Sequence, residues 1–169
     1  MRIPLPIWLG LLLGLVGCND DSLIWSRLKD PPTLTEVRSA GLLIGPTNAP
    51  VERVLILNYG SRGCRKCQRL LEEALTRWRQ EVEGGRLRLR VVLGQNGKPL
   101  GGLFCMATQG KIWNTLEDLR QNKMPPECPL DATKRQAEEK LLNKAASTAP
   151  GVVLLVYSEK SLQEAWELR

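Results

Sequence analysis

The chain has no histidine among its 169 residues, and this absence limits its chemistry. Covalent haem attachment requires a histidine directly after a Cys-X-X-Cys motif, and Gln68 stands at that place. Structural zinc sites usually recruit two close-spaced pairs of ligands, whereas this chain offers one, Cys64 and Cys67. Haem attachment is therefore excluded, a metal site is disfavoured, and we expect no cofactor.

The chain also lacks a hydrophobic run long enough to cross a bilayer. Its longest apolar run, residues 7–16, has ten residues, whereas a spanning helix needs about 20. Such a run after Arg2 is typical of a secretory signal. The Leu-Val-Gly-Cys string that ends at Cys18 resembles the lipobox of bacterial lipoproteins. The resemblance implies an acylated Cys18 in the bacterial cell envelope, anchored to the lipid bilayer and facing the periplasm. The alternative is an ordinary signal with an incidental cysteine.

The length that remains after such a signal is enough for one ordinary domain. Residues 18–40 contain several prolines and are expected to form a lipid-anchored tether. The predicted organisation is therefore a signal peptide at 1–17, a tether at 18–40 and a single domain at 41–169.

A strong excess of one charge is absent. Removal of residues 1–17 takes away Arg2 and leaves 23 Lys and Arg against 18 Asp and Glu. Arginine-rich stretches at 77–79 and 86–90 invite a nucleic-acid interpretation. The alternating Arg and Leu of 86–90 fit a half-buried, half-solvated strand better, and an exported protein rarely meets nucleic acid. No nucleic-acid partner is expected.

Hydrophobic periodicity predicts strands that alternate with helices. Strands are expected at 41–44, 51–59, 86–93 and 152–157, from their β-rich and apolar residues. Helices are expected from Cys64 to Val82, in two short pieces around Phe104 and Trp113, at 131–146 with Asp131 as the cap, and at 161–168. This alternation predicts an α/β fold.

The five cysteines divide into Cys18, the close pair Cys64 and Cys67, and the distant Cys105 and Cys128. The close pair lies where a predicted strand gives way to a predicted helix. Two cysteines three residues apart on a first helical turn share one face and can form a disulfide. The spacing therefore predicts a redox-active pair, with a structural disulfide or half of a zinc site as the alternatives.

The surroundings of Cys64 favour its thiolate form. A sulfur at a helix N-terminus meets unsatisfied N–H groups and the positive end of the helix dipole. Arg62, Arg65 and Lys66 add positive charge. Cys64 is thus the expected exposed nucleophile, which forms a mixed disulfide with a substrate, and Cys67 is the cysteine that resolves it.

The ordered set of motifs resembles the thioredoxin-fold catalytic domain of the periplasmic DsbC/DsbG disulfide isomerases. The set comprises a strand, the Cys-X-X-Cys at the start of a helix, a helical insertion with two cysteines, and Thr148-Ala149-Pro150 before an apolar strand. The resemblance implies a thioredoxin-like fold, in which the insertion lies between the Cys-X-X-Cys helix with its following strand and the cis-proline strand. It also implies a structural disulfide between Cys105 and Cys128, and a cis-proline at Pro150 that helps Ala149 bind substrate.

Some positions depart from the family's pattern. Only about thirty residues separate Cys18 from the first firm strand, in place of the family's N-terminal dimerisation domain, so a monomer is expected. Asn58 stands near the place where thioredoxins have a buried carboxylate. The predicted terminal helix follows Tyr157 almost at once, which leaves little room for an edge strand and predicts a shortened sheet.

The favoured function is a membrane-tethered thiol-disulfide oxidoreductase that acts on exported, cysteine-containing proteins and is reset by a membrane redox partner. Residue identity does not fix the direction of electron flow. One alternative is a non-catalytic thioredoxin-scaffold lipoprotein within an envelope assembly such as a secretion or conjugation system. The other is a copper or zinc carrier that uses the Cys64 and Cys67 thiolates.

Overall fold

The computed structural model describes residues 25–158 and 161–168. None of the helices in this part of the chain combines the length and the hydropathy of a transmembrane span. The predicted signal peptide and Cys18 lie outside the described residues. The strands are β1 (Trp25–Arg27), β2 (Leu42–Ile44), β3 (Val51–Tyr59), β4 (Leu87–Gln95), β5 (Lys98–Pro99), β6 (Gly151–Ser158) and β7 (Ser161–Leu168). The helices are α1 (Leu34–Ser39), α2 (Arg65–Glu73), the π-helical η1 (Ala74–Trp78), α3 (Arg79–Glu83), α4 (Gly102–Thr108), α5 (Ile112–Arg120) and α6 (Ala132–Ala145).

The strands form one mixed sheet in the order β1-β7-β6-β3-β4-β2, with β5 paired to β4. Only the central β3 and β4 are parallel to each other, because the helical segment from α2 to α3 carries the chain back between them. β6 runs antiparallel to β3, and β7 antiparallel to β6. This topology, with the Cys-X-X-Cys helix directly after β3, is a thioredoxin-like fold, as expected.

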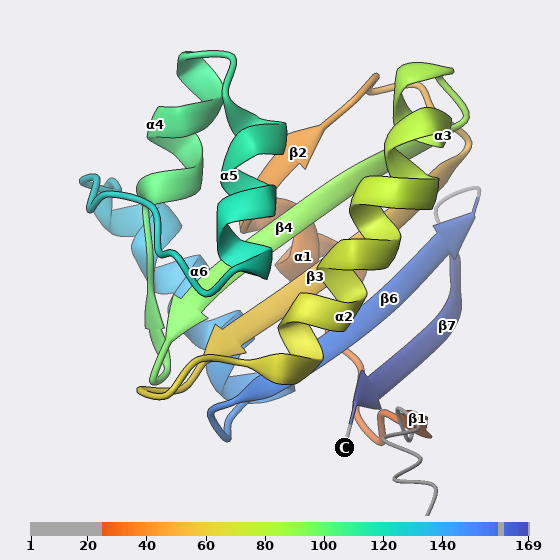
Figure 1. Ribbon diagram of the computed structural model, residues 1–169. Coiled ribbons are helices and arrows are strands. Elements are labelled where there is room, and N and C mark those ends of the chain that lie inside the picture. Colours follow the sequence, from red (N-terminus) through yellow and green to blue (C-terminus); the bar gives the residue numbers. More distant parts are fainter. Residues whose placement is uncertain (1–24, 159–160, 169) are drawn as a thin grey trace, which may run out of the picture.

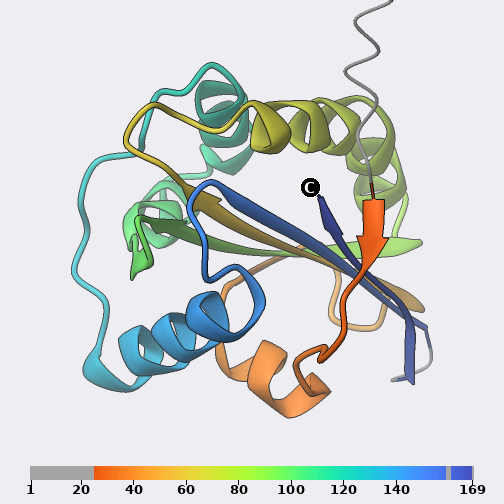
Figure 2. The ribbon, with the colours of Figure 1, turned by 90° about the horizontal axis from the view of Figure 1, so that it is seen from below.

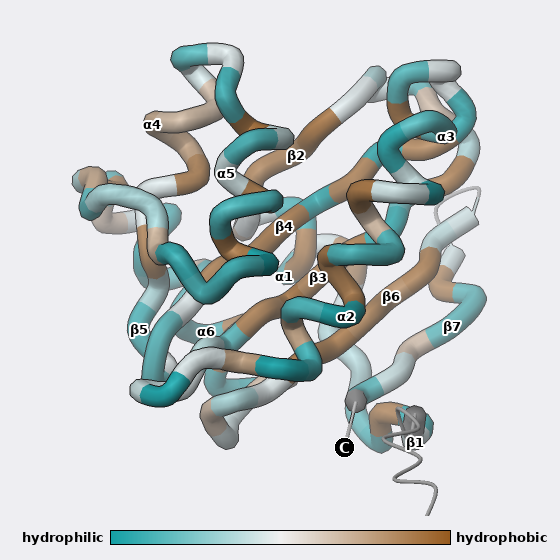
Figure 3. The backbone as a smooth tube through the Cα atoms, viewed as in Figure 1, coloured by the Kyte–Doolittle hydropathy of each residue, from teal (hydrophilic) through white to brown (hydrophobic). Residues whose placement is uncertain are grey.

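Helices cover the sheet on both faces (Figure 2). The α2, η1, α3 and α5 segments lie over one face, and α1 and α6 lie over the other. β3 supplies both cores, since successive side chains of a strand point to opposite faces. Leu55 and Leu57 pack under α2, whereas Val54 and Ile56 pack against α6, and all four are fully buried. The hydrophobic residues accordingly follow the central strands in Figure 3.

The expected helix from Cys64 to Val82 is continuous but not uniform. It runs through α2, η1 and α3, with a π-helical turn at its centre, and ends at Gly84. Gly85 follows with a φ of 74°, which glycine adopts readily. The second long helix, α6, has the expected cap: the Asp131 carboxylate accepts the Lys134 N–H at 2.9 Å.

The prediction of a helix at 161–168 is wrong, because this segment is the strand β7. It pairs antiparallel with β6 from Ser158 and Ser161 onward. Its Leu, Gln, Glu and Ala residues favour a helix locally, but the very short connection places its backbone beside the edge of β6 that β3 leaves unpaired. Pairing satisfies those backbone groups, so the expectation of a shortened sheet is also wrong.

Part of the segment expected to be a tether belongs to the folded domain. β1 pairs with β7, and α1 packs beside α6. A capping box fixes the start of α1, in which Thr33 and Glu36 each bond the other's backbone N–H. Trp25 pairs with Leu168, so the chain enters the sheet at the end where β7 finishes and α2 begins (Figure 1).

The alternating Arg and Leu strand is only partly as expected. Leu87 and Leu89 of β4 are fully buried, as the pattern predicts. Of the arginines in this pattern, Arg86 is exposed as expected, but Arg88 is half-buried and Arg90 is buried. Arg88 and Arg90 both form ion pairs, at 2.7 Å, with the carboxylate of Glu52, which is itself 2% exposed.

Candidate active site

Cys64 and Cys67 form a disulfide across the first turn of α2. β3 ends at Tyr59, a short loop follows, and Cys64 is the N-cap residue of α2 with an extended φ of −147°. The two Cα atoms are 5.2 Å apart, within the range that a disulfide allows. The strand thus delivers the pair to the positive end of the helix, at the position that the sequence predicted.

A backbone group makes the polar contact to the Cys64 sulfur. The Cys67 N–H donates to Cys64 Sγ at 3.1 Å, which places one of the unsatisfied donors of the helix start on this atom. Arg62 and Arg65 are exposed, so water screens their charges, and Lys66 is half-buried. The backbone N–H of Cys67 is therefore the nearest group that favours a thiolate at Cys64.

The disulfide is much less accessible than expected. Cys64 is 2% exposed and Cys67 is fully buried, so the expectation of an exposed nucleophile at Cys64 is wrong for this oxidised state. The cause is the packing of two other segments beside the loop that leads into α2. Asn122 contacts this loop from one direction, and Pro150 contacts it from another.

Pro150 lies next to the loop before α2. The Ala149–Pro150 peptide bond is cis, at the place that the resemblance implied. A Cβ atom on Gly60 would lie 3.3 Å from Pro150 Cδ, so the absence of a side chain at Gly60 permits this close approach. Ala149 and Pro150 are both exposed. A cleft of about 380 Å³ opens beside Pro150, lined also by Lys66, Thr148 and Glu167.

Asn122 contacts Cys64 and is not among the site residues predicted from the sequence. It follows α5 in the helical insertion, 58 residues along the chain from Cys64, and its Oδ1 accepts the Cys64 N–H at 3.2 Å. Nothing in the local pattern links two such distant positions. The one local signal is the residue type, because asparagine adopts a positive φ, here 59°, more readily than most residues.

The helical insertion has its own disulfide, between Cys105 in α4 and Cys128 in the loop before α6. The two Cα atoms are 6.3 Å apart, and 23 positions separate the residues in sequence. The backbone packs tightly here, because a Cβ atom on Gly101 would collide with the Cys128 carbonyl oxygen. The disulfide thus fixes the two ends of the insertion to each other.

Asn58 is fully buried in β3, one residue before its end, and acts as a hydrogen-bonding group. Its Nδ2 donates to the Ala146 carbonyl oxygen at 2.7 Å, and its Oδ1 accepts the Gly97 N–H at 2.9 Å. An amide does not titrate, so this side chain cannot accept a proton from the Cys67 thiol. An amide that bonds backbone groups therefore stands at position 58 in place of a carboxylate.

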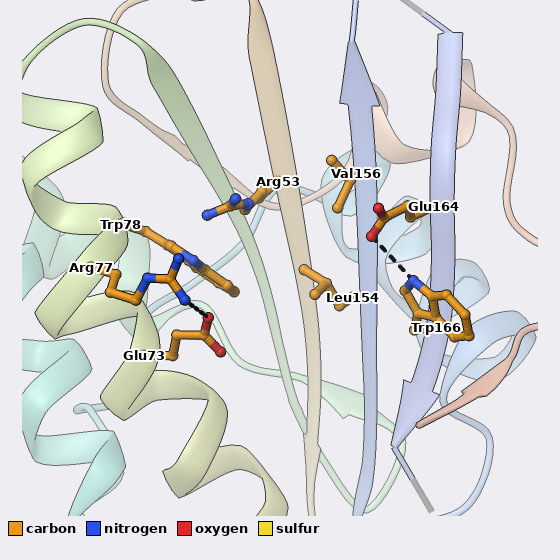
Figure 4. A pocket seen from close by; sticks show the side chains of 8 residues that line it. All are labelled: Arg53, Glu73, Arg77, Trp78, Leu154, Val156, Glu164 and Trp166. Carbon is orange, nitrogen blue, oxygen red and sulfur yellow. Dashed lines mark hydrogen bonds and ion pairs between the residues drawn. The ribbon is translucent and has the colours of Figure 1, made fainter. Parts of the chain in front are cut away.

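A second cleft, of about 400 Å³, lies on the open sheet face between η1 and β7 (Figure 4). Its floor is Leu154 and Val156, and the Arg53 guanidinium stacks 4.7 Å from the ring centroid of Trp78 on one wall. On the other wall, Trp166 Nε1 donates to Glu164 at 3.2 Å. None of the predicted site residues lines this cleft, so we assign it no part in disulfide exchange.

Comparison of the chain with known protein families and with curated proteins found no match. Several solved structures are similar to it, among them the following three. A conserved protein of unknown function from Enterococcus faecalis V583 has 18% identity and a TM-score of 0.46, with 78% of this chain and 87% of the other covered. Oxidised BdbD from Bacillus subtilis has 13% identity and a TM-score of 0.38, covering 82% and 89%. DsbA from Chlamydia trachomatis has 14% identity and a TM-score of 0.35, covering 82% and 88%.

Proposed function

We propose that the protein is a thiol-disulfide oxidoreductase that exchanges electrons through Cys64 and Cys67. The observation that carries the proposal is the disulfide at the N-terminus of α2, with the Cys67 N–H 3.1 Å from Cys64 Sγ. The donor and the helix dipole stabilise negative charge on this sulfur. A stabilised thiolate is a good leaving group, which disulfide exchange requires.

The reaction of the oxidised pair takes two steps. A client thiolate attacks Cys64 Sγ, a mixed disulfide forms, and Cys67 leaves as a thiolate that takes a proton from water. A second client thiolate then attacks the client sulfur of the mixed disulfide, and Cys64 leaves as a thiolate. The client loses two electrons and gains a disulfide, and the protein becomes a dithiol. The reduced protein runs the same steps in reverse, so the direction depends on the two reduction potentials.

The cleft beside Ala149 and Pro150 is the proposed binding site for an extended client segment. Ala149 is exposed between Thr148 and Pro150, and its backbone would pair with such a segment as an added strand. Lys66 and Glu167 line the same cleft and supply charges of both signs. Recognition through the backbone would tolerate many client sequences.

We place the protein in the bacterial envelope, tethered through Cys18 and reset by a membrane redox partner. This part of the proposal is supported by the apolar run at 7–16 and the Leu-Val-Gly-Cys string. It is also consistent with β1, which brings the chain into the sheet at the end that carries the disulfide. The likeness to the DsbC/DsbG class remains a prediction from the motifs.

A second candidate function is a non-catalytic scaffold within an envelope assembly. The observation that favours it is the burial of both sulfur-bearing residues, since Cys64 is 2% exposed and Cys67 is fully buried. A disulfide that no reductant reaches would act only as a structural crosslink. The two candidates therefore differ in whether Cys64 reacts.

Trapping with Cys67→Ala separates the two candidates. Without Cys67 the mixed disulfide on Cys64 has no resolving thiol, so it accumulates. We expect adducts of exported proteins on a non-reducing gel from cells that express this variant. The matched control is Cys64→Ala, which leaves Cys67 fully buried and is expected to give none. An equal absence of adducts from both variants would favour the scaffold.

A further inference from the structure

Asn122 joins the helical insertion to the N-terminus of α2. Its Oδ1 lies 3.2 Å from the Cys64 nitrogen, and its amide group lies flat against Gly63. A Cβ atom on Gly63 would lie 2.7 to 2.8 Å from the amide atoms of Asn122, which would force the two apart. The contact therefore depends on a glycine at the position before Cys64.

The residues around Asn122 hold it in place. The Asn122 N–H donates to the Leu119 carbonyl oxygen at 2.9 Å. The Tyr59 hydroxyl, at the end of β3, donates to the same oxygen at 2.9 Å and is buried. Met124, two residues later, packs against the apolar cluster that contains Cys64. The end of α5 is thus fixed to the strand that leads into the site.

We propose that Asn122 is a positioning residue for Cys64, which orients its sulfur and closes the insertion side of the site, so that a client sulfur approaches along the Ala149–Pro150 side. The inference rests on the proposed function, because it assigns a route to the same reacting atom. It adds a role for the insertion, which supplies the residue.

The orienting effect follows from the hydrogen bonds of Cys64. The N-cap residue must hold an extended backbone, with a φ of −147° here, for its side chain to accept the Cys67 N–H. Asn122 bonds the N–H on the other side of the same Cα atom. Loss of this bond would let the N-cap rotate and would weaken the contact between Cys64 Sγ and the Cys67 N–H. A less stabilised thiolate has a higher pKa.

The closing effect follows from the burial of Cys64 and from the exposure of the Thr148–Pro150 segment. Cys64 is 2% exposed although Asn122 itself is exposed, so the amide lies between water and the loop that carries the cysteine. Thr148, Ala149 and Pro150 are all exposed, and Thr148 and Pro150 line the cleft of about 380 Å³. The open approach is therefore the side away from the insertion.

Substitution of Asn122 by glycine tests the orienting effect. Glycine keeps the positive φ and removes only the amide, whereas alanine would strain the backbone. In the reduced full chain in mild detergent, iodoacetamide alkylation of Cys64 is followed by mass spectrometry across pH. Asn122→Gly should raise the Cys64 pKa by about half a unit and the high-pH plateau rate by about threefold. The matched control is Asn96→Gly, another exposed asparagine with a positive φ of 51°, which should change neither value.

A conservative variant separates positioning from a general loss of structure. Asn122→Asp keeps the acceptor oxygen, so its plateau rate should stay at the wild-type value, while the added negative charge raises the Cys64 pKa. Equal pKa values and plateau rates in Asn122→Gly and the wild type would overturn the inference, even though Cys64 itself reacted normally. A wild-type Cys64 with an ordinary thiol pKa would instead count against the proposed function. If Asn122→Gly fails to fold, a plateau rate for Asn122→Asp as high as about threefold the wild-type value overturns the inference.

Blocking each side in turn tests the route of approach. The probe is a short peptide with an internal disulfide, and the readout is its rate of reduction by the reduced protein. Thr148→Trp fills the proposed route and should slow this reaction by about tenfold, while iodoacetamide still reaches Cys64. The matched Lys123→Trp, an exposed residue on the insertion side, should leave the rate within about twofold. A greater loss for Lys123→Trp than for Thr148→Trp would overturn the route.

Discussion

The two disulfides of the described chain differ in burial and in the length of chain that they enclose. Cys64–Cys67 is buried and joins residues three apart, whereas Cys105 and Cys128 are half-buried and 23 positions apart. On the chain-entropy model a loop of 23 residues stabilises the fold by about 3 kcal/mol and a loop of three by about 2 kcal/mol. The buried pair gains less from crosslinking, but it alone lies on a helix N-terminus. The helix N-terminus therefore suits Cys64–Cys67 to exchange, whereas the longer loop suits Cys105–Cys128 to stabilising the fold.

The largest expected effect is on exchange activity. Cys64→Ser should lower the rate of disulfide exchange with a peptide substrate by more than about a thousandfold, because the attacked sulfur is lost. The Cys105→Ser/Cys128→Ser double variant should retain its rate within about twofold while it stays folded. Stopped-flow or discontinuous thiol assays measure both. A similar loss in the two variants would remove the distinction between the pairs.

The next largest effect is on stability, and here the loss of Cys105–Cys128 should cost more than the loss of Cys64–Cys67. Cys105→Ser/Cys128→Ser should lower the free energy of unfolding by about 3 kcal/mol, from the larger loop that it opens. The matched Cys64→Ser/Cys67→Ser variant should lose about 2 kcal/mol from loop entropy. Urea denaturation of both variants and the wild type gives the two values. A clearly larger loss for the Cys64 and Cys67 variant would show that the buried pair is the main crosslink.

The stability of the fold should depend on pH through a group other than the thiols. Glu138 of α6 is 1% exposed, and burial raises the pKa of its carboxyl from the ordinary 4.5 to about 7. The folded state therefore binds the proton more tightly than the unfolded state. Stability from this group is full below about pH 4.5 and is lost as the pH rises to about 7, by up to about 3 kcal/mol. The fall should be absent in Glu138→Gln, and parallel stability curves for the two proteins would contradict the assignment.

The smallest effect should come from the hydrogen bond that links β3 to the helical insertion. Tyr59→Phe removes the hydroxyl that donates to the Leu119 carbonyl oxygen, which keeps its bond from the Asn122 N–H. A loss of about 1 kcal/mol in the free energy of unfolding is expected, and thermal or urea unfolding measures it. Unchanged stability would mean that apolar packing alone holds the insertion against β3.

Features encoded in neighbouring residues could be predicted from the sequence. The apolar β-rich runs located β3 and β6, Asp131 marked the start of α6, and the cysteine spacing placed Cys64 at a helix start. The thioredoxin-like fold followed from the order of these features along the chain. Each of these signals spans fewer than about a dozen residues, which is why a single sequence carries it.

Features that depend on distant contacts could not be predicted. β7 has helix-favouring residues and becomes a strand because β6 offers it backbone partners. The bond from Asn122 to Cys64 joins positions 58 residues apart, and the burial of Cys64 follows from such packing. Local charge and helix position describe how stable a thiolate is, but they do not describe what covers it.

The position of β1 sets how far the reactive end could lie from a lipid anchor. Seven peptide units separate Cys18 from Trp25, and a fully stretched chain of that length reaches about 24 Å. Since Trp25 enters the sheet at the end where α2 begins, an acylated Cys18 would keep that end of the domain close to the bilayer. The protein would then sample only a thin layer of the periplasm, and newly exported chains would meet the disulfide within a few nanometres of the bilayer.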